Sequence, residues 1–208
     1  MKNVFFTSDT HYNHANIVKG TTSWDNHKRC RDFATLDEHN ATLVENINKV
    51  VGENDELYHL GDWSFGGKQA ISDFRSRLNC GNIHLILGNH DHHIERNTDN
   101  LRSLFHSVSH YKEISVASQK IILCHYAMRV WNLSHKGSWM LYGHSHGTLP
   151  NYRDDEQSFD NMKDIFYKTM DVGIDTHENF RPYHFDEIVY MMRNRVNLNV
   201  DHHNSNTN

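Results

Sequence analysis

The side chains best suited to bind a metal ion in this sequence follow apolar segments, in each case directly after the segment ends. The five segments and their candidate residues are FFTSDTH (Asp9, His11), YHLGD (Asp62), LILGNHD (Asn89, His90, Asp91), IILCH (His125) and MLYGHSH (His144, His146). Carboxylate, amide and imidazole groups without a thiolate favour divalent ions such as Mn, Fe, Zn, Co or Ni. The pattern therefore predicts a divalent metal site built from distant parts of the chain.

The number of candidates indicates more than one ion. A four-coordinate zinc ion uses three or four protein groups, whereas a larger set with one shared carboxylate fits two ions about 3.5 to 4 Å apart. Asp9 and His11 are two residues apart, as are His144 and His146. In extended backbone such side chains point to the same side, so we expect each pair to face one site.

Strands must bring these segments to one edge of a sheet. Apolar, β-prone residues predict strands over 3–8, 56–60 and 83–87, with helices over 36–51 and 68–78 between them. The first of these helices has a Thr35/Glu38 capping box before it and Gly52 after it. Alternating strands and helices favour a layered α/β fold with a largely parallel sheet. Sites in such folds form beyond the carboxyl ends of the strands, where the candidate ligands lie.

A second sheet is expected from the second half of the chain. Residues 111–116 and 120–124 flank a short polar turn as in a hairpin, and 139–142 and 168–172 are further strand candidates. We expect one domain over residues 1–196, because no repeat or linker divides the chain. Residues 197–208 are almost entirely polar and lack periodicity, which predicts a flexible tail.

Composition argues against several classes of protein. The formal net charge of -5 provides no general attraction for nucleic acid or anionic lipid. The three cysteines lack CxxC spacing, which disfavours a disulfide framework and favours a reducing compartment. Cys124 faces away from its neighbour His125 if the strand continues, so we expect a packed thiol rather than a nucleophile. No apolar run approaches the roughly 18 residues of a membrane span, so we expect a cytoplasmic protein without a membrane partner.

Taken in order, the five blocks resemble the calcineurin-like metallophosphoesterases. The resemblance rests on DTH at 9–11, GD at 61–62, GNHD at 88–91, the single His125 and GHSH at 143–146. It implies a two-sheet β-sandwich whose mixed, largely parallel first sheet is flanked by helices, in a four-layer αββα arrangement. It also implies two divalent ions, with Mn as the first choice and Fe, Zn, Ni or Co as alternatives.

The resemblance also gives individual residues a role. The implied ligand sets are Asp9, His11, Asp62 and His146 for one ion, and Asp62, Asn89, His125 and His144 for the other. Asp62 would bridge the ions, and His90 would protonate the leaving group with Asp91 as its orienting partner. The implied reaction is hydrolysis of a phosphate ester by a hydroxide that bridges the metals, without a covalent intermediate.

The motifs narrow the substrate only in part. Phosphoprotein phosphatases of this superfamily carry GDxxDR and GNHE, whereas this chain has GDWSFGG and GNHD, which favours the small phosphodiesterases. We therefore expect hydrolysis of a phosphodiester that is small or derived from a nucleotide or nucleic-acid end. The alternatives are a phosphomonoesterase acting on a small substrate and a non-catalytic metal-binding scaffold of the same fold. The oligomeric state is left open.

Other polar residues near the motifs each have two possible roles. His14 could contact the substrate or be structural, and Arg129 could grip a phosphate or form a surface ion pair. A basic cluster before the first predicted helix could reach the substrate or be solvated. Its members are Lys28, Arg29 and Arg31.

Overall fold

The structure is a computed structural model that describes residues 2–19, 31–149 and 167–198. The first sheet pairs its strands in the order β4 (Ser107–Ser109), β3 (Asn82–Ile86), β2 (Glu56–His59), β1 (Val4–Thr7) and β9 (Tyr183–His184). The second pairs β5 (Tyr111–Val116), β6 (Gln119–Cys124), β7 (Trp139–Tyr142) and β8 (Thr169–Asp171).

Four α-helices and four short 3-10 helices are found in the described residues. The α-helices are α1 (Leu36–Val50), α2 (Gly67–Arg77), α3 (His92–Glu95) and α4 (Phe185–Met192). The 3-10 helices are η1 (Ala15–Ile17), η2 (Thr98–Leu104), η3 (Ser134–Lys136) and η4 (Ile174–Thr176). None of the helices in the described residues is long and apolar enough to cross a membrane.

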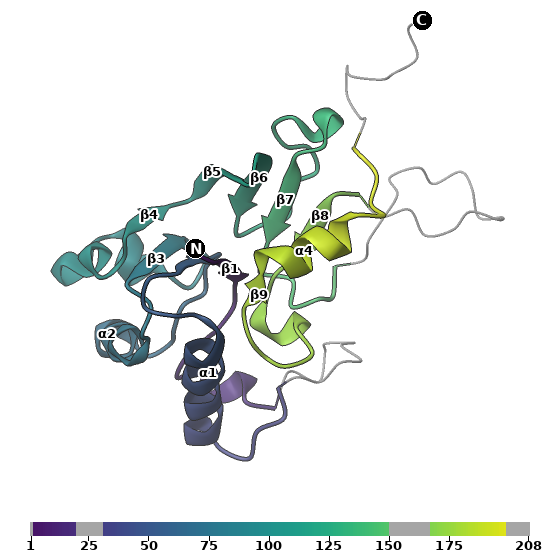
Figure 1. Cartoon of the computed structure of the whole chain (residues 1–208). Coiled ribbons are helices and arrows are strands. Elements are labelled where there is room, and N and C mark those ends of the chain that lie inside the picture. The colour runs from purple at the N-terminus through teal and green to yellow at the C-terminus, as the bar shows by residue number, and fades with distance from the viewer. Residues whose placement is uncertain (1, 20–30, 150–166, 199–208) are drawn as a thin grey trace, which may run out of the picture.

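Both sheets are mostly parallel (Figure 1). Strands β1 to β4 pair in parallel, and β9 joins β1 antiparallel at the edge. In the second sheet β6, β7 and β8 are parallel and β5 forms an antiparallel hairpin with β6. The predicted α/β class, with two sheets flanked by helices, is confirmed.

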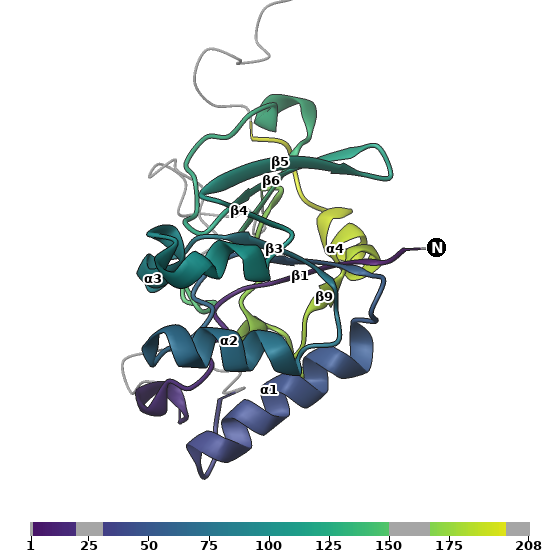
Figure 2. The same ribbon diagram turned by 90° about the vertical axis from the view of Figure 1, so that its left-hand side faces the viewer.

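The layers follow from the alternation of side chains along each strand. In Figure 2 the strands β5 and β6 lie above the first sheet, and helices α1 and α2 lie below it. Phe5 of β1 packs in the apolar cluster that holds Leu43 of α1 and Phe74 of α2. The next residue, Phe6, points to the opposite face and packs in the cluster between the sheets, which includes Leu141 of β7.

The outer face of the second sheet is covered by irregular chain and by the C-terminal part of the described residues. Ile122 and Met140 pack there with Trp131 and with Leu198, which is 3% exposed. Asn197 donates a hydrogen bond to the backbone carbonyl of His135. These two residues, 197 and 198, were expected to begin a flexible tail, but an apolar side chain packs at 198. The rest of the expected tail, 199–208, lies outside the described residues.

The start of α1 differs in detail from the predicted capping box. The Thr35 hydroxyl accepts a hydrogen bond from the Glu38 backbone N–H at 3.1 Å, as expected. The Glu38 carboxylate instead accepts from the backbone N–H of Ala34, one residue further back, at 2.8 Å. The helix start is thus satisfied by two side chains.

Replacing the capping hydroxyl tests this account of α1. We expect Thr35→Ala to lower the free energy of unfolding by about 0.5–2 kcal/mol, because an N–H at the helix start loses its acceptor. Thr42→Ala, inside the same helix, is the matched control and is expected to be neutral or slightly stabilising, since Ala has the higher helix propensity. Urea unfolding followed by circular dichroism measures both. Equal losses in the two variants would contradict the capping role.

Candidate metal centre

The seven candidate metal ligands lie just beyond the carboxyl ends of strands from both sheets. Strand β1 precedes Asp9 and His11, β2 precedes Asp62, and β3 precedes Asn89. In the second sheet β6 precedes His125, and β7 precedes His144 and His146. Their loops border a cavity of about 230 Å³. Its lining consists of His11, His14, Asn16, Ile17, Asp62, Asn89, His90, His144 and His146.

Two groups of ligand atoms form within this region. Asp9, His11 and His146 make the first group, and Asp62, His125 and His144 make the second. In each group one ligand atom per residue lies within 4.8 Å of the others. The Oδ2 atom of Asp62 lies 3.5 Å from His11 Nε2 and 3.6 Å from His125 Nε2, so it stands between the two groups.

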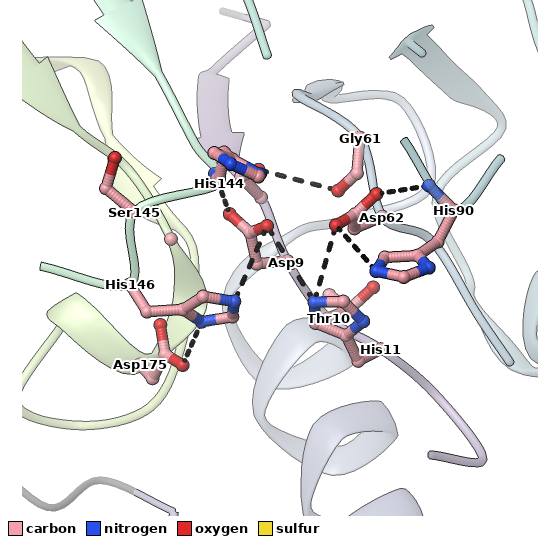
Figure 3. Close-up of polar contacts among 12 residues, drawn as sticks. Asp9, Thr10, His11, Gly61, Asp62, His90, His144, Ser145, His146 and Asp175 are labelled. Carbon is pink, nitrogen blue, oxygen red and sulfur yellow. Dashed lines mark hydrogen bonds and ion pairs between the residues drawn. The ribbon is translucent and has the colours of Figure 1, made fainter. Parts of the chain in front are cut away.

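Each aspartate divides its two oxygens between the backbone and the site (Figure 3). Asp9 Oδ2 accepts from the backbone N–H of His144, and Asp62 Oδ1 accepts from that of His90, both at 2.9 Å. The other oxygen of Asp9 lies 3.9 Å from the Nε2 atoms of His11 and His146. The loops from different strands are therefore linked through the same carboxylates that offer an oxygen to the site.

Two histidines are oriented through Nδ1. His125 Nδ1 donates to the backbone carbonyl of Leu60 at 2.7 Å, because a carbonyl can only accept. His146 Nδ1 lies 2.7 Å from Asp175 Oδ2. Both contacts direct Nε2 toward the ligand groups, and His125 Nε2 also lies 3.0 Å from Asn89 Oδ1.

The centre contains buried polar atoms that lack a hydrogen-bond partner. Among the described residues these atoms include Asp9 Oδ1 and both ring nitrogens of His11. Leaving such groups unpaired costs about 1–3 kcal/mol each. A cation bound between Asp9, His11 and His146 would satisfy Asp9 Oδ1 and a His11 nitrogen, so the donor set fits a divalent metal ion.

Burial and neighbouring charges shift the pKa values of the first group. Burial raises the pKa of Asp9 to about 7, and burial together with the Arg31 charge holds the pKa of His11 well below its usual value. His146 differs, because although burial lowers its pKa, the Asp175 and Asp9 carboxylates raise it above the ordinary value. Burial would also raise the pKa of Asp175, but Arg31 and His146 hold it well below its usual range.

The ligand loops do not have the extended backbone that the two-residue spacing suggested. Asp9 and His11 have φ values of 54° and 45°, and His144 and His146 have 68° and 48°. Asp62 is also left-handed, at 57°. The expectation was wrong because β1 and β7 end before their ligands, so each pair lies in a tight loop. A left-handed residue other than glycine costs roughly 1–2 kcal/mol, so these loops need support.

Asp91 supplies part of that support rather than the expected contact with His90. Its carboxylate accepts from the backbone N–H groups of Asp62, Trp63 and Gly88, at 2.8, 3.0 and 2.8 Å. The side chain is 2% exposed and turns toward these loops, which is why it braces them. His90 lies at the cavity, with its Nε2 4.0 Å from Asp62 Oδ2 and its side chain 38% exposed.

Three residues that the sequence analysis did not assign to the site support it. Asp171 accepts from the backbone N–H groups of Gly147 and Gly173. Asp175 contacts His146 and Arg31, and Arg31 is buried, not in the solvated or substrate-facing position expected of the basic cluster. The signal for Asp175 was present, because it follows the predicted strand 168–172 as the ligands follow theirs.

The remaining candidates are divided between the site and the surface. His14 lines the cavity and stacks on Phe65, with ring centroids 3.8 Å apart. Arg129 is exposed and is not part of the cavity lining. Cys124 is half-buried and packs against the apolar cluster on the outer face of the second sheet. Lys28 and Arg29 lie outside the described residues.

Two glycines permit the close approach of the ligand loops. A Cβ atom at Gly143 would lie 1.9 Å from Ser8 Oγ and 2.6 Å from Asp9 Oδ2. At Gly88 it would lie 2.4 Å from Asp62 Oδ1. Side chains at these positions would displace the candidate ligands directly.

Comparison with known proteins agrees with this geometry. Residues 1–159 match the family model of the calcineurin-like phosphoesterase superfamily domain. The chain belongs to the calcineurin-like phosphoesterase superfamily. Members of this superfamily are metal-dependent hydrolases of phosphate esters, and the two ligand groups suit such an activity.

Several relatives extend the match along the chain. An uncharacterised protein of Methanocaldococcus jannaschii is 30% identical over 194 residues, which cover 92% of each chain. The gene 66 protein of Mycobacterium phage D29 is 30% identical over 172 residues, 72% of this chain and 81% of the phage protein. A crystal structure of a protein of unknown function from Aquifex aeolicus matches with a TM-score of 0.60 at 18% identity, covering 92% of this chain and 100% of that one. This last likeness shows the shared fold.

Substitution of Gly143 tests whether close approach is needed at this phosphoesterase centre. We expect Gly143→Ala to destabilise the protein by about 1–3 kcal/mol and to lower bound manganese, because the new methyl group collides with Ser8 and Asp9. Gly81→Ala is the control, since its Cβ would make an ordinary 3.5 Å contact with the Glu53 carbonyl. Urea unfolding and metal analysis by mass spectrometry provide the readouts. Normal metal content in Gly143→Ala would contradict the packing argument.

Proposed function

We propose that this protein is a phosphodiesterase with a binuclear metal centre that hydrolyses small or nucleotide-derived phosphodiesters. The observation that carries the proposal is the position of Asp62 Oδ2, which lies 3.5 and 3.6 Å from histidine nitrogens of two separate ligand groups. A carboxylate oxygen between two such groups suits a bridging ligand. The cavity beside it provides room for the substrate phosphate.

Seven residues would hold the two ions. The first ion would be bound by Asp9, His11, Asp62 and His146, and the second by Asp62, Asn89, His125 and His144. When bound, such ions acidify a water molecule and neutralise charge on the phosphate. Carboxylate, amide and imidazole ligands suit manganese.

We also propose a cytoplasmic location. Cys80 and Cys124 are free thiols, and free thiols are typical of a reducing compartment.

The lining of the cavity favours a diester over a monoester. Among the described residues that line it there is no lysine or arginine. A phosphomonoester carries about -1.5 to -2 charges at neutral pH, whereas a diester carries a single charge. A lining of histidine, asparagine, isoleucine and one aspartate therefore suits the less charged ester, and the ions can balance the remaining charge.

His90 is placed to assist the departure of the leaving group. Its backbone N–H is fixed on Asp62 Oδ1, and its imidazole borders the cavity while staying partly exposed. An imidazole there can donate a proton to the leaving oxygen and recover it from solvent. Asp91 acts on the same loops from behind, because it fixes the backbone of Gly88 and Asp62.

Two substitutions separate metal binding from proton donation. We expect Asp62→Asn to abolish turnover and lower the number of bound ions, because the proposed bridge loses its charge. We expect His90→Ala to retain both ions and to lower kcat by roughly 10²–10⁴-fold, the usual contribution of a general acid. Metal analysis and steady-state kinetics on the same samples measure both effects. The assigned roles are wrong if His90→Ala loses metal as severely as Asp62→Asn.

A pair of chromogenic esters tests the activity itself. We expect hydrolysis of bis-p-nitrophenyl phosphate in the presence of manganese, with a higher kcat/KM than for p-nitrophenyl phosphate, since the cavity lining suits a single negative charge. Removal of metal with a chelator should stop the reaction, and added manganese should restore it. A folded, manganese-loaded protein that hydrolyses neither ester would instead support the metal-binding scaffold.

A further inference from the structure

A buried ion pair lies behind the first ligand group, made by residues far apart in the sequence. Asp175, in η4, is 2% exposed, and Arg31 is 3% exposed. The Arg31 Nε donates to Asp175 Oδ2 at 2.8 Å, and the same oxygen lies 2.7 Å from His146 Nδ1. Asp175 also lies beyond residues 1–159, the part that matches the family model.

The other nitrogens of Arg31 hold the loop that carries Asp9 and His11. Nη1 donates to the backbone carbonyl of Thr10 at 3.3 Å, and Nη2 donates to that of Asp9. Nη1 also lies 2.9 Å from His39 Nε2 on α1. One guanidinium group thus contacts the left-handed loop after β1, helix α1 and Asp175, and all of these contacts are buried.

Both contacts restrict members of the same ligand group. Asp175 fixes the ring of His146, and Arg31 fixes the backbone at Asp9 and Thr10, next to His11. The second group is supported differently, since the backbone carbonyl of Leu60 holds His125 Nδ1 and the backbone N–H of His90 holds the Asp62 carboxylate. Side-chain substitution at the ion pair should therefore act on one group and spare the other.

We propose that Arg31 and Asp175 are positioning residues that set the metal affinity of the group formed by Asp9, His11 and His146. The inference rests on the proposed binuclear function. Figure 3 shows the arrangement, in which His146 lies between Asp9 of the site and Asp175 behind it. Arg31 contacts the same oxygen of Asp175 as His146 does and also binds the backbone of the loop that carries Asp9, so the ligands of this group share one support.

Titration of the metal-free full chain with manganese tests the proposal without using activity. Asp175→Asn keeps the shape of the side chain and removes the charge that orders His146 and Arg31. We expect two binding steps in the wild type and, in Asp175→Asn, one step weakened by about 10–100-fold with the other unchanged. Cobalt provides a second readout, because its visible spectrum should change for the affected ion alone.

Two further variants keep the test decisive. Arg31→Lys retains the charge but cannot reach Asp175, Asp9 and Thr10 together, so it should weaken the same step, and it takes over the test if Asp175→Asn does not fold. Glu187→Gln is the control, because it disrupts the pair between the Glu187 carboxylate on α4 and Arg181, which precedes that helix. This control should lower Tm and leave both manganese steps as in the wild type.

The outcomes distinguish this inference from the function on which it rests. If the wild type shows two binding steps and both are unchanged in Asp175→Asn and Arg31→Lys, the positioning role is wrong. That result would leave the binuclear function intact. Equal weakening of both steps in these variants would also overturn the positioning role, because that result indicates general destabilisation. A wild-type protein that binds a single manganese ion would overturn the binuclear proposal and this inference with it.

Discussion

The centre depends on two buried aspartates that each serve two loops at once. Asp9 accepts a backbone N–H from the loop after β7, and Asp62 accepts one from the loop after β3. Each keeps a second oxygen close to histidine nitrogens of the ligand groups. The convergence of distant strand ends is therefore enforced by the same carboxylates that would bind the ions, and loss of either would loosen both the loops and the ligand set.

The cost of this arrangement is seen in the backbone and in the burial of charge. Asp9, His11, Asp62, His144 and His146 all have left-handed φ values, in loops short enough to bring their side chains together. Three further carboxylates offset that strain: Asp91 and Asp171 accept backbone N–H groups of the turns, and Asp175 pairs with Arg31. Burial raises the pKa of Asp91 to about 6 and that of Asp171 to about 7. Asp91 and Asp175 are therefore as buried as Asp9 and Asp62, whereas Asp171 is half-buried.

Sequence patterns predicted the elements that carry periodic apolar residues and the turns that carry ligands. Apolar runs predicted strands β1, β2, β3, β6 and β7. The candidate ligands that follow these strands in the sequence meet at one site. Two short elements were not predicted. Strand β9 has only two residues, too few for a pattern. Helix α4 is capped by His184, whose ring accepts from the Asp186 N–H in place of the usual hydroxyl or carboxylate. The direction of the Asp91 side chain was missed because only tertiary contacts determine it.

The supporting residues were harder to predict than the ligands for a physical reason. A ligand must present a particular atom type at the end of a strand, which leaves a recognisable pattern, whereas a supporting residue needs only to reach a backbone group or a ring nitrogen. Arg31 lies beside basic residues that resemble a solvated cluster, yet its side chain is buried. Asp171 ends the last strand of the second sheet and Asp175 follows it, so residues 167–198 contribute no candidate ligand but hold the loop after β7 in place. The metal chemistry of this chain therefore depends on parts of the fold that the family motifs do not include.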